Sequence, residues 1–133
     1  TRVRSLRNDY DSSIHYHDSV VSITLDLTRQ HGKKAAWVYL SDHGQEVGHV
    51  GEHVGHSALT ADGYRVPVLL WGDAIEGLAT RTFLQPVRTD WLGYSVMRLL
   101  GIDWIGHVPQ QDVLDPKYEW KPPPLRMVKD FRS

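Results

Sequence analysis

Apolar side chains recur at helical spacing near the start of the chain, between about Asn8 and His31. The stripe consists of Tyr10, Ile14, His17, Val21, Leu25 and Thr28. This period matches the 3.6 residues of a helical turn and predicts an amphipathic helix. Asn8, Asp9 and Asp11 suit its N-terminus, and Gly32 suits the left-handed position that follows a helix.

Two later segments have the pattern of strands. The run Ala35–Leu40 is apolar without alternation, which is typical of a strand covered on both faces in the middle of an α/β sheet. The run Tyr64–Trp71 predicts a second strand. Pro67 cannot donate a ladder hydrogen bond, so pairing is expected to begin after it.

The rest of the chain is a loop, a second helix and a tail. Glycines at 44, 48, 51 and 55 argue against a regular helix between the strands. Thr89-Asp90 is expected to cap a helix over Trp91–Leu100, with Gly101 as its stop. Its apolar face would comprise Leu92, Val96, Leu99 and Leu100. From about 112 to 133, the run Lys121-Pro122-Pro123-Pro124 predicts irregular chain on a surface.

Composition excludes several classes of protein. The 133 residues carry 15 Lys and Arg against 16 Asp and Glu, so the basic field of a nucleic-acid binder is missing. The absence of cysteine excludes disulfides and thiolate metal sites. No run approaches the roughly 20 apolar residues of a membrane span, and no signal peptide is visible. The opening Thr1–Arg7 reads as a cut inside a longer protein.

The candidate chemistry follows the first strand. Asp42 and His43 leave its carboxyl end, where α/β sheets bind ligands. Carboxylate oxygen and imidazole nitrogen are zinc ligands, and a turn at Asp42 would aim both at one ion. Half of the eight histidines lie between His43 and His56, including His49 and His53. The alternative is a solvated polar loop that binds metal only adventitiously.

These residues resemble a known family in their order along the chain. Ser41-Asp42-His43-Gly44 after a strand, Gly55-His56-Ser57 closing a glycine-rich loop, and the Val66–Trp71 strand are similar to the metal-site region of sulfatase-like phosphoethanolamine transferases. Tyr10–Asp18, Thr89-Asp90 and Asp112-Val113-Leu114 extend the resemblance over most of the chain. It implies an α/β fold: residues 1–133 would be the C-terminal part of one alkaline-phosphatase-like domain, with helices packed on a small, mainly apolar sheet.

The resemblance also implies roles for individual residues. Asp42 and His43 match the pair that ligates catalytic zinc, and His56 matches a histidine that contacts the transferred phosphate or a second metal ion, with His53 as the substitute. The loop departs from the family pattern at Gln45, Glu46 and His49, and the spacing to His56 is about one residue longer.

The resemblance implies partners and a location as well. The donor would be phosphatidylethanolamine and the acceptor lipid A or the lipopolysaccharide core, in a bacterial inner-membrane protein whose catalytic part faces the periplasm. The threonine nucleophile, a glutamate ligand and the membrane anchor would lie upstream, so the fragment is expected to be inactive alone and able to dimerise through an exposed sheet edge. The alternatives are a sulfatase or phosphodiesterase of the same superfamily, and a non-catalytic metal-binding or interaction module.

The tryptophans allow two interpretations. Trp37 and Trp71 are expected to pack in or beside the sheet. Trp91, Trp104 and Trp120 could form a lipid-facing surface, but packing within the protein is the favoured interpretation.

Overall fold

The computed structural model describes residues 2–31, 34–48, 52–72 and 85–124. They form two compact units built from interleaved segments. Of these residues, unit 1 comprises 2–30, 39–48 and 52–67, and unit 2 comprises 31, 34–38, 68–72 and 85–124. Among the described residues, no helix combines the length and the hydrophobicity needed to cross a membrane.

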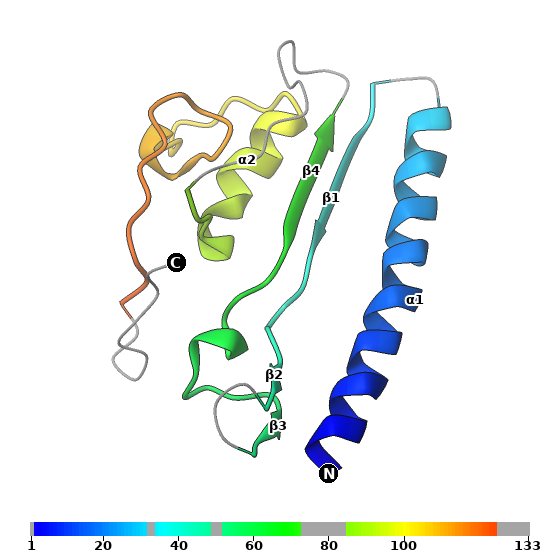
Figure 1. Ribbon diagram of the computed structural model, residues 1–133. Helices are drawn as coiled ribbons and strands as arrows, with labels where there is room; N and C mark the ends of the chain where they lie inside the picture. The colour runs from blue at the N-terminus through cyan, green and yellow to red at the C-terminus, as the bar shows by residue number, and fades with distance from the viewer. Residues whose placement is uncertain (1, 32–33, 49–51, 73–84, 125–133) are drawn as a thin grey trace. The chain divides into compact units, whose positions relative to one another are not determined.

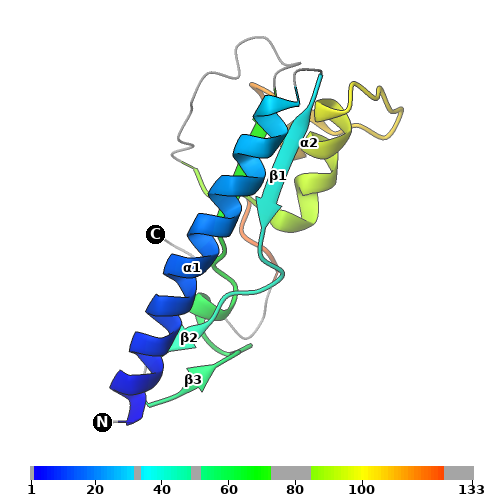
Figure 2. The ribbon, with the colours of Figure 1, turned by 90° about the vertical axis from the view of Figure 1, so that its right-hand side faces the viewer.

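Unit 1 consists of a long helix and a small hairpin. The helix α1 spans Arg2–Gln30, and the strands β2 (Glu46–Val47) and β3 (Val54–Gly55) pair antiparallel, with Glu46 opposite Gly55. Figures 1 and 2 both show this hairpin beside the N-terminal turns of α1. Arg7 joins them, because its guanidinium donates to the carbonyl oxygens of Val47 at 3.0 Å and Gly48 at 2.8 Å. The short 3-10 helix η1 spans Ala61–Gly63.

The predicted first helix is confirmed, but its predicted start is wrong. Asn8, Asp9 and Asp11 lie inside α1 and do not cap it, because the arginines and Leu6 that precede them favour the helix and extend it to Arg2. No residue of α1 is buried. Ile14, Ile23 and Leu27 of its apolar side are among the exposed large hydrophobic residues. Gly32 lies outside the described residues.

Unit 2 contains a two-stranded sheet and a short helix. The strand β4 (Val68–Gly72) pairs with β1 (Ala36–Leu40), whose first three residues belong to this unit. Pairing therefore begins after Pro67, as predicted. The helix α2 spans Leu92–Leu99, preceded by the 3-10 helix η2 (Thr89–Trp91) and followed by η3 (Pro109–Gln111). Gly72 lies against Leu99, because a Cβ there would meet the Leu99 side chain at 3.0 Å.

The core of unit 2 combines apolar and polar residues. Leu92, Leu99 and Val113 are its buried apolar residues, and Ser95 and Asp112 are completely buried beside them. The prediction of a tail wholly on the surface is therefore wrong at Asp112 and Val113. The predicted burial of Leu100 is also wrong, since it lies beyond the end of α2 and is 61% exposed.

Three further local predictions have mixed outcomes. The stop at Gly101 is confirmed by its left-handed φ of 67° and by the bond from its N–H to the Arg98 carbonyl at 3.0 Å. The Thr89-Asp90 cap is wrong: no side chain caps α2, and the Asp90 carboxylate pairs with Arg88 instead. The prediction that β1 is covered on both faces in the middle of a sheet is also wrong: it is half-buried or exposed along its length, and among the described residues only β4 pairs with it.

Candidate metal centre

A tight turn follows β1 in unit 1 and positions Asp42 and His43. The Ser41 hydroxyl donates to the His43 carbonyl oxygen at 2.8 Å, and the backbone N–H of His43 donates to Asp42 Oδ1 at 3.0 Å. These two bonds within three residues bend the chain where an extended strand would point successive side chains to opposite faces. Both side chains can therefore project from the same turn.

A backbone bond sets the tautomer of His43. Its Nδ1 lies 2.9 Å from the carbonyl oxygen of Gly44. A carbonyl oxygen only accepts, so Nδ1 carries the proton and Nε2 of the neutral ring keeps its lone pair. Zinc-binding histidines commonly donate their other ring N–H to a carbonyl in this way. Nε2 of His43 is thus the nitrogen prepared for a metal ion.

The two ligand atoms face each other in an open setting. His43 Nε2 lies 4.0 Å from Asp42 Oδ1, and the two side chains are 45% and 89% exposed, respectively. Ligand atoms about 2.0–2.1 Å from a tetrahedral zinc ion stand roughly 3.3 Å apart. The two atoms are therefore farther apart than two ligands of one zinc ion, and Asp42 Oδ1 also accepts the His43 N–H at 3.0 Å.

Glycines bring His56 to the same turn. The Gly44 N–H donates to the Gly63 carbonyl at 2.9 Å, and a Cβ on Gly44 would overlap the carbonyl oxygens of Asp62 and Arg65. A Cβ on Gly63 would likewise overlap the carbonyl oxygen of Ser57, the residue after His56. Gly44 is therefore required for close approach of backbone, not for a left-handed turn, since its φ is not positive.

The result is a compact group of three side chains, Asp42, His43 and His56, here called the Asp42 cluster. The rings of His43 and His56 lie with their centroids 4.3 Å apart and their planes tilted by 53°. The structure thus places His43 beside both Asp42 and His56, but the three residues do not offer ligand atoms within 4.8 Å of one another. Their ligand role remains a prediction at this point.

The other candidates of the loop differ from His56. His53 Nε2 lies 3.3 Å from the His56 carbonyl oxygen, so this nitrogen is engaged with backbone and is less free to bind a metal ion. His49 lies outside the described residues. Glu46, which the sequence marked only as a departure from the family pattern, is a completely buried carboxylate in β2.

A second set of histidine and aspartate side chains lies in unit 2 and was missed as a group. His107, Asp112 and Asp115 offer ligand atoms within 4.8 Å of one another, a tighter arrangement than the Asp42 cluster provides within the described residues. With Ser95 and Arg98 they form what is here called the Asp112 cluster. This cluster becomes evident only from the contacts of Asp112 with His107, 5 positions earlier, and with Ser95, 17 positions earlier.

Hydrogen bonds already use both oxygens of Asp112. Oδ1 accepts from the Ser95 hydroxyl at 2.7 Å and from the Leu114 N–H at 3.0 Å. Oδ2 accepts from Arg98 Nη1 at 3.1 Å and lies 3.1 Å from His107 Nε2. Burial alone would raise the pKa of Asp112, but these hydrogen bonds together lower it below its ordinary value.

Arg98 supplies the positive charge of this cluster. Its Nη1 also lies 3.1 Å from Asp115 Oδ2, so one guanidinium bridges both carboxylates. A divalent ion bound here would have to displace this internal cation or be repelled by it. The contacts of the Asp112 cluster are those of a structural ion-pair network that ties α2 to the segment after η3.

Comparison with known proteins identifies the family of this chain. The family model for sulfatases matches residues 1–102, which carry the Asp42 cluster and α2. The chain belongs to the sulfatase family. Its α/β elements are those of part of such a domain, as the resemblance predicted.

The curated relatives of this sulfatase-family chain are phosphoethanolamine transferases. It is 28% identical over 121 residues to phosphoethanolamine transferase EptC of Escherichia coli strain K12, an alignment that covers 84% of this chain and 21% of the relative. It is 38% identical over 72 residues to phosphoethanolamine transferase EptA of Escherichia coli O157:H7, covering 50% of this chain and 13% of the relative. The chain thus spans about a fifth or less of these relatives. No solved structure matches it.

Proposed function

We propose that this chain forms the zinc-binding C-terminal part of a phosphoethanolamine transferase. The observation that carries the proposal is the proximity of His43 Nε2 and Asp42 Oδ1 at 4.0 Å in a chain of the sulfatase family. The relatives are named phosphoethanolamine transferases, so phosphoethanolamine is the group that would be transferred. Phosphatidylethanolamine would be the donor and lipid A or the lipopolysaccharide core the acceptor, at the periplasmic side of a bacterial inner membrane.

The residues present fit a zinc ion. The donor set is one carboxylate oxygen and one imidazole nitrogen whose tautomer a backbone carbonyl fixes, with a second imidazole beside them. Asp42 and His43 would hold the ion, and His56 would complete the set or contact the transferred phosphate. Catalytic zinc sites usually employ three protein ligands and keep one position open, so further ligands from upstream residues are required.

The chain's own residues then have separate tasks. The Gly44–Gly63 contact keeps the turn rigid, and the Gly44 carbonyl holds the proton on His43 Nδ1. His56 is exposed, and it would donate a hydrogen bond to an oxygen of the transferring phosphoryl group. When bound, zinc would act as a Lewis acid toward a phosphoryl oxygen and an upstream hydroxyl nucleophile. Without that nucleophile, the chain alone is expected to be inactive.

Calorimetric titration with zinc tests the site. Replacing both ligands in Asp42→Ala with His43→Ala should weaken binding by more than about 100-fold, because even the residues that orient ligands are worth 10–100-fold. His56→Ala should weaken it less. The matched control is Asp11→Ala with His15→Ala, which removes an exposed Asp and His pair from α1. Equal zinc affinity in the wild type and the Asp42-His43 double variant contradicts the proposal.

A hydrolase is the second candidate, because the matching family model is that of the sulfatases. Both activities would use the same metal pair and differ in the upstream nucleophile and in the acceptor. The discriminating experiment gives the full-length parent protein a phosphatidylethanolamine labelled in its headgroup, together with lipid A. Labelled lipid A indicates a transferase, whereas release of free phosphoethanolamine, or cleavage of an aryl sulfate, indicates a hydrolase.

Self-association belongs to the same proposal. The described sheet of unit 2 has only two strands, and unpaired edges recruit further strands. A dimer at high concentration is therefore expected in light scattering. A monomer throughout the concentration range removes this part of the proposal and leaves the zinc site unaffected.

A further inference from the structure

The loop that follows α2 in unit 2 exposes large apolar side chains. Leu100, Ile102, Trp104 and Ile105 are 61%, 47%, 43% and 108% exposed. Single exposed apolar residues are ordinary on a protein surface, but four among six consecutive residues form a patch that requires an explanation. This segment is here called the Leu100–Ile105 loop.

Specific contacts hold the loop in shape. The Trp104 ring stacks on Tyr94 of α2, with centroids 5.0 Å apart and planes only 2° from parallel. A Cβ on Gly106 would overlap the Trp104 indole, so glycine is needed for this ring position. The His107 N–H donates to the Trp104 carbonyl at 3.0 Å and closes the turn. These contacts define the turn that holds the apolar side chains at the surface.

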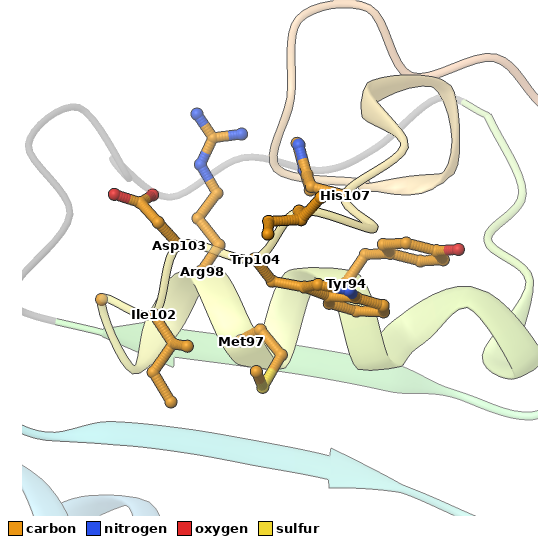
Figure 3. A pocket seen from close by; sticks show the side chains of 9 residues that line it. Tyr94, Met97, Arg98, Ile102, Asp103, Trp104 and His107 are labelled. Carbon is orange, nitrogen blue, oxygen red and sulfur yellow. The ribbon is translucent and has the colours of Figure 1, made fainter.

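The loop and α2 enclose an open cavity of about 500 Å³. Figure 3 shows the stacked rings of Trp104 and Tyr94 at one side of this cavity, Met97 and Ile102 in the lower part of the view, and Arg98 and Asp103 at the other side. The volume falls within the roughly 300–1,000 Å³ of small-molecule sites. Its walls combine apolar side chains with two opposite charges, which is the composition of a site for an amphiphile.

Both charged groups have capacity left for a ligand. Arg98 uses Nη1 for Asp112 and Asp115, so the edge formed by Nε and Nη2 has no acceptor within the described part of the chain. That edge has the fork geometry that accommodates a phosphate oxygen pair. Asp103 is exposed and forms no ion pair or hydrogen bond with the described residues, which leaves its carboxylate available to an ammonium group.

We propose that the Leu100–Ile105 loop and this cavity dock on a membrane surface of zwitterionic lipid. The phosphate of a headgroup binds the free edge of Arg98, its ammonium binds Asp103, and Ile102, Trp104 and Ile105 enter the interfacial region. Tryptophan and tyrosine are enriched at that depth of a bilayer, where a ring meets both apolar and polar surroundings. The proposal concerns unit 2 alone and stands apart from the zinc site.

Charge favours zwitterionic over anionic lipid. Proteins that bind anionic membranes present clusters of lysine and arginine, and the Leu100–Ile105 loop contains neither. The nearest arginine, Arg98, is already balanced by Asp112 and Asp115, and Asp103 adds a negative charge. This surface would repel phosphatidylglycerol, whereas a headgroup that carries both charges matches it.

Vesicle co-sedimentation of the 133-residue chain tests the proposal in the presence of a chelator, so that zinc plays no part. The chain should bind vesicles of phosphatidylethanolamine and phosphatidylcholine at least as well as vesicles containing phosphatidylglycerol. Ile105→Ser should lower the partition coefficient about tenfold, because it removes one apolar side chain from the interface. Asp103→Asn should lower binding to the zwitterionic vesicles and raise binding to the anionic ones.

The controls use residues of matched exposure elsewhere. Leu59→Ser changes a leucine that is 65% exposed in unit 1, and Asp9→Asn removes an exposed carboxylate from α1; both should leave partitioning unchanged. Three results overturn the proposal: no vesicle binding by the wild type, equal binding by Ile105→Ser, or binding confined to anionic vesicles. Since Ile105 is fully exposed, its replacement should leave the circular dichroism spectrum unchanged.

Discussion

The Asp42 cluster and the Asp112 cluster contain the same residue types in opposite circumstances. At the first, the Asp42 and His43 side chains are 89% and 45% exposed, and Nε2 of His43 lies 4.0 Å from Oδ1 of Asp42. At the second, Asp112 is completely buried and both of its oxygens are engaged. Tight geometry alone would select the second cluster as a metal site. Arg98 argues against metal binding there, because its guanidinium already places a positive charge beside the carboxylates of Asp112 and Asp115.

Asp112→Asn should have the largest effect on stability and thereby sharpen this comparison. The amide would place donors opposite Arg98 and His107 and leave the guanidinium without part of its partner, so a loss of about 4 kcal/mol in the free energy of unfolding is expected. Urea unfolding followed by tryptophan fluorescence measures it. Asp103→Asn is the control, and its value should stay close to wild type. A loss of zinc affinity in Asp112→Asn would break the comparison.

Gly44→Ala tests the support of the metal turn. A methyl group there meets the carbonyl oxygens of Asp62 and Arg65, which are backbone atoms and cannot rotate away. We expect a loss of about 3 kcal/mol in the free energy of unfolding, at the upper end for overpacking, and weaker zinc binding. Gly93→Ala is a matched control, since a Cβ at Gly93 meets nothing within 4 Å. Unchanged zinc affinity in a folded Gly44→Ala protein would contradict the role given to this contact.

Acid should weaken the Asp112 cluster. The pKa of Asp112 and that of Asp115 are lower in the folded chain than the ordinary 3.8, so the stability they contribute is present above the unfolded value and is lost as pH falls through the folded pKa. Urea midpoints should be nearly constant from neutral pH to about pH 5 and decline below about pH 4. Asp112→Asn should flatten that decline. If the urea midpoints of this variant decline as those of the wild type do, groups other than Asp112 cause the acid sensitivity.

Asp42→Asn should have the smallest effect on stability. Its side chain is exposed, and the amide oxygen can still accept from the His43 N–H, so the free energy of unfolding should change by no more than about 0.5 kcal/mol. Calorimetry on the same sample should nevertheless record a loss of zinc affinity. Destabilisation as large as that of Asp112→Asn would show that Asp42 is structural and would erase the distinction between the clusters.

Local patterns predicted the elements and the turn at Asp42 and His43, because the information lay within a few positions. The helical stripe before Gln30, pairing after Pro67 and the stop at Gly101 are of this kind. Asp42 and His43 were found because they follow the strand directly. These are properties of neighbouring residues, which periodicity and turn chemistry describe well.

Contacts between distant residues were not predictable in the same way. Asp112 lies beside a proline-rich tail, and only its bonds to Ser95 and Arg98, 17 and 14 positions earlier, explain its burial. The role of Gly44 depends on Asp62 and Arg65, so the sequence indicated only that a regular helix is disfavoured there, whereas the structure has a close backbone contact. The capping prediction at Asp90 failed because Arg88 offers the carboxylate a stronger partner than the helix end does.

The contacts of Gly44 with Gly63, and of Gly63 with Ser57, have a consequence for how this lineage can diverge. They fix both ends of the stretch between residues 44 and 57, so its middle can gain a residue or change its side chains without moving the imidazoles at either end. Insertions and exchanges should therefore accumulate there among related sequences. The one-residue difference in spacing before His56 is the kind of drift that such an anchored loop absorbs.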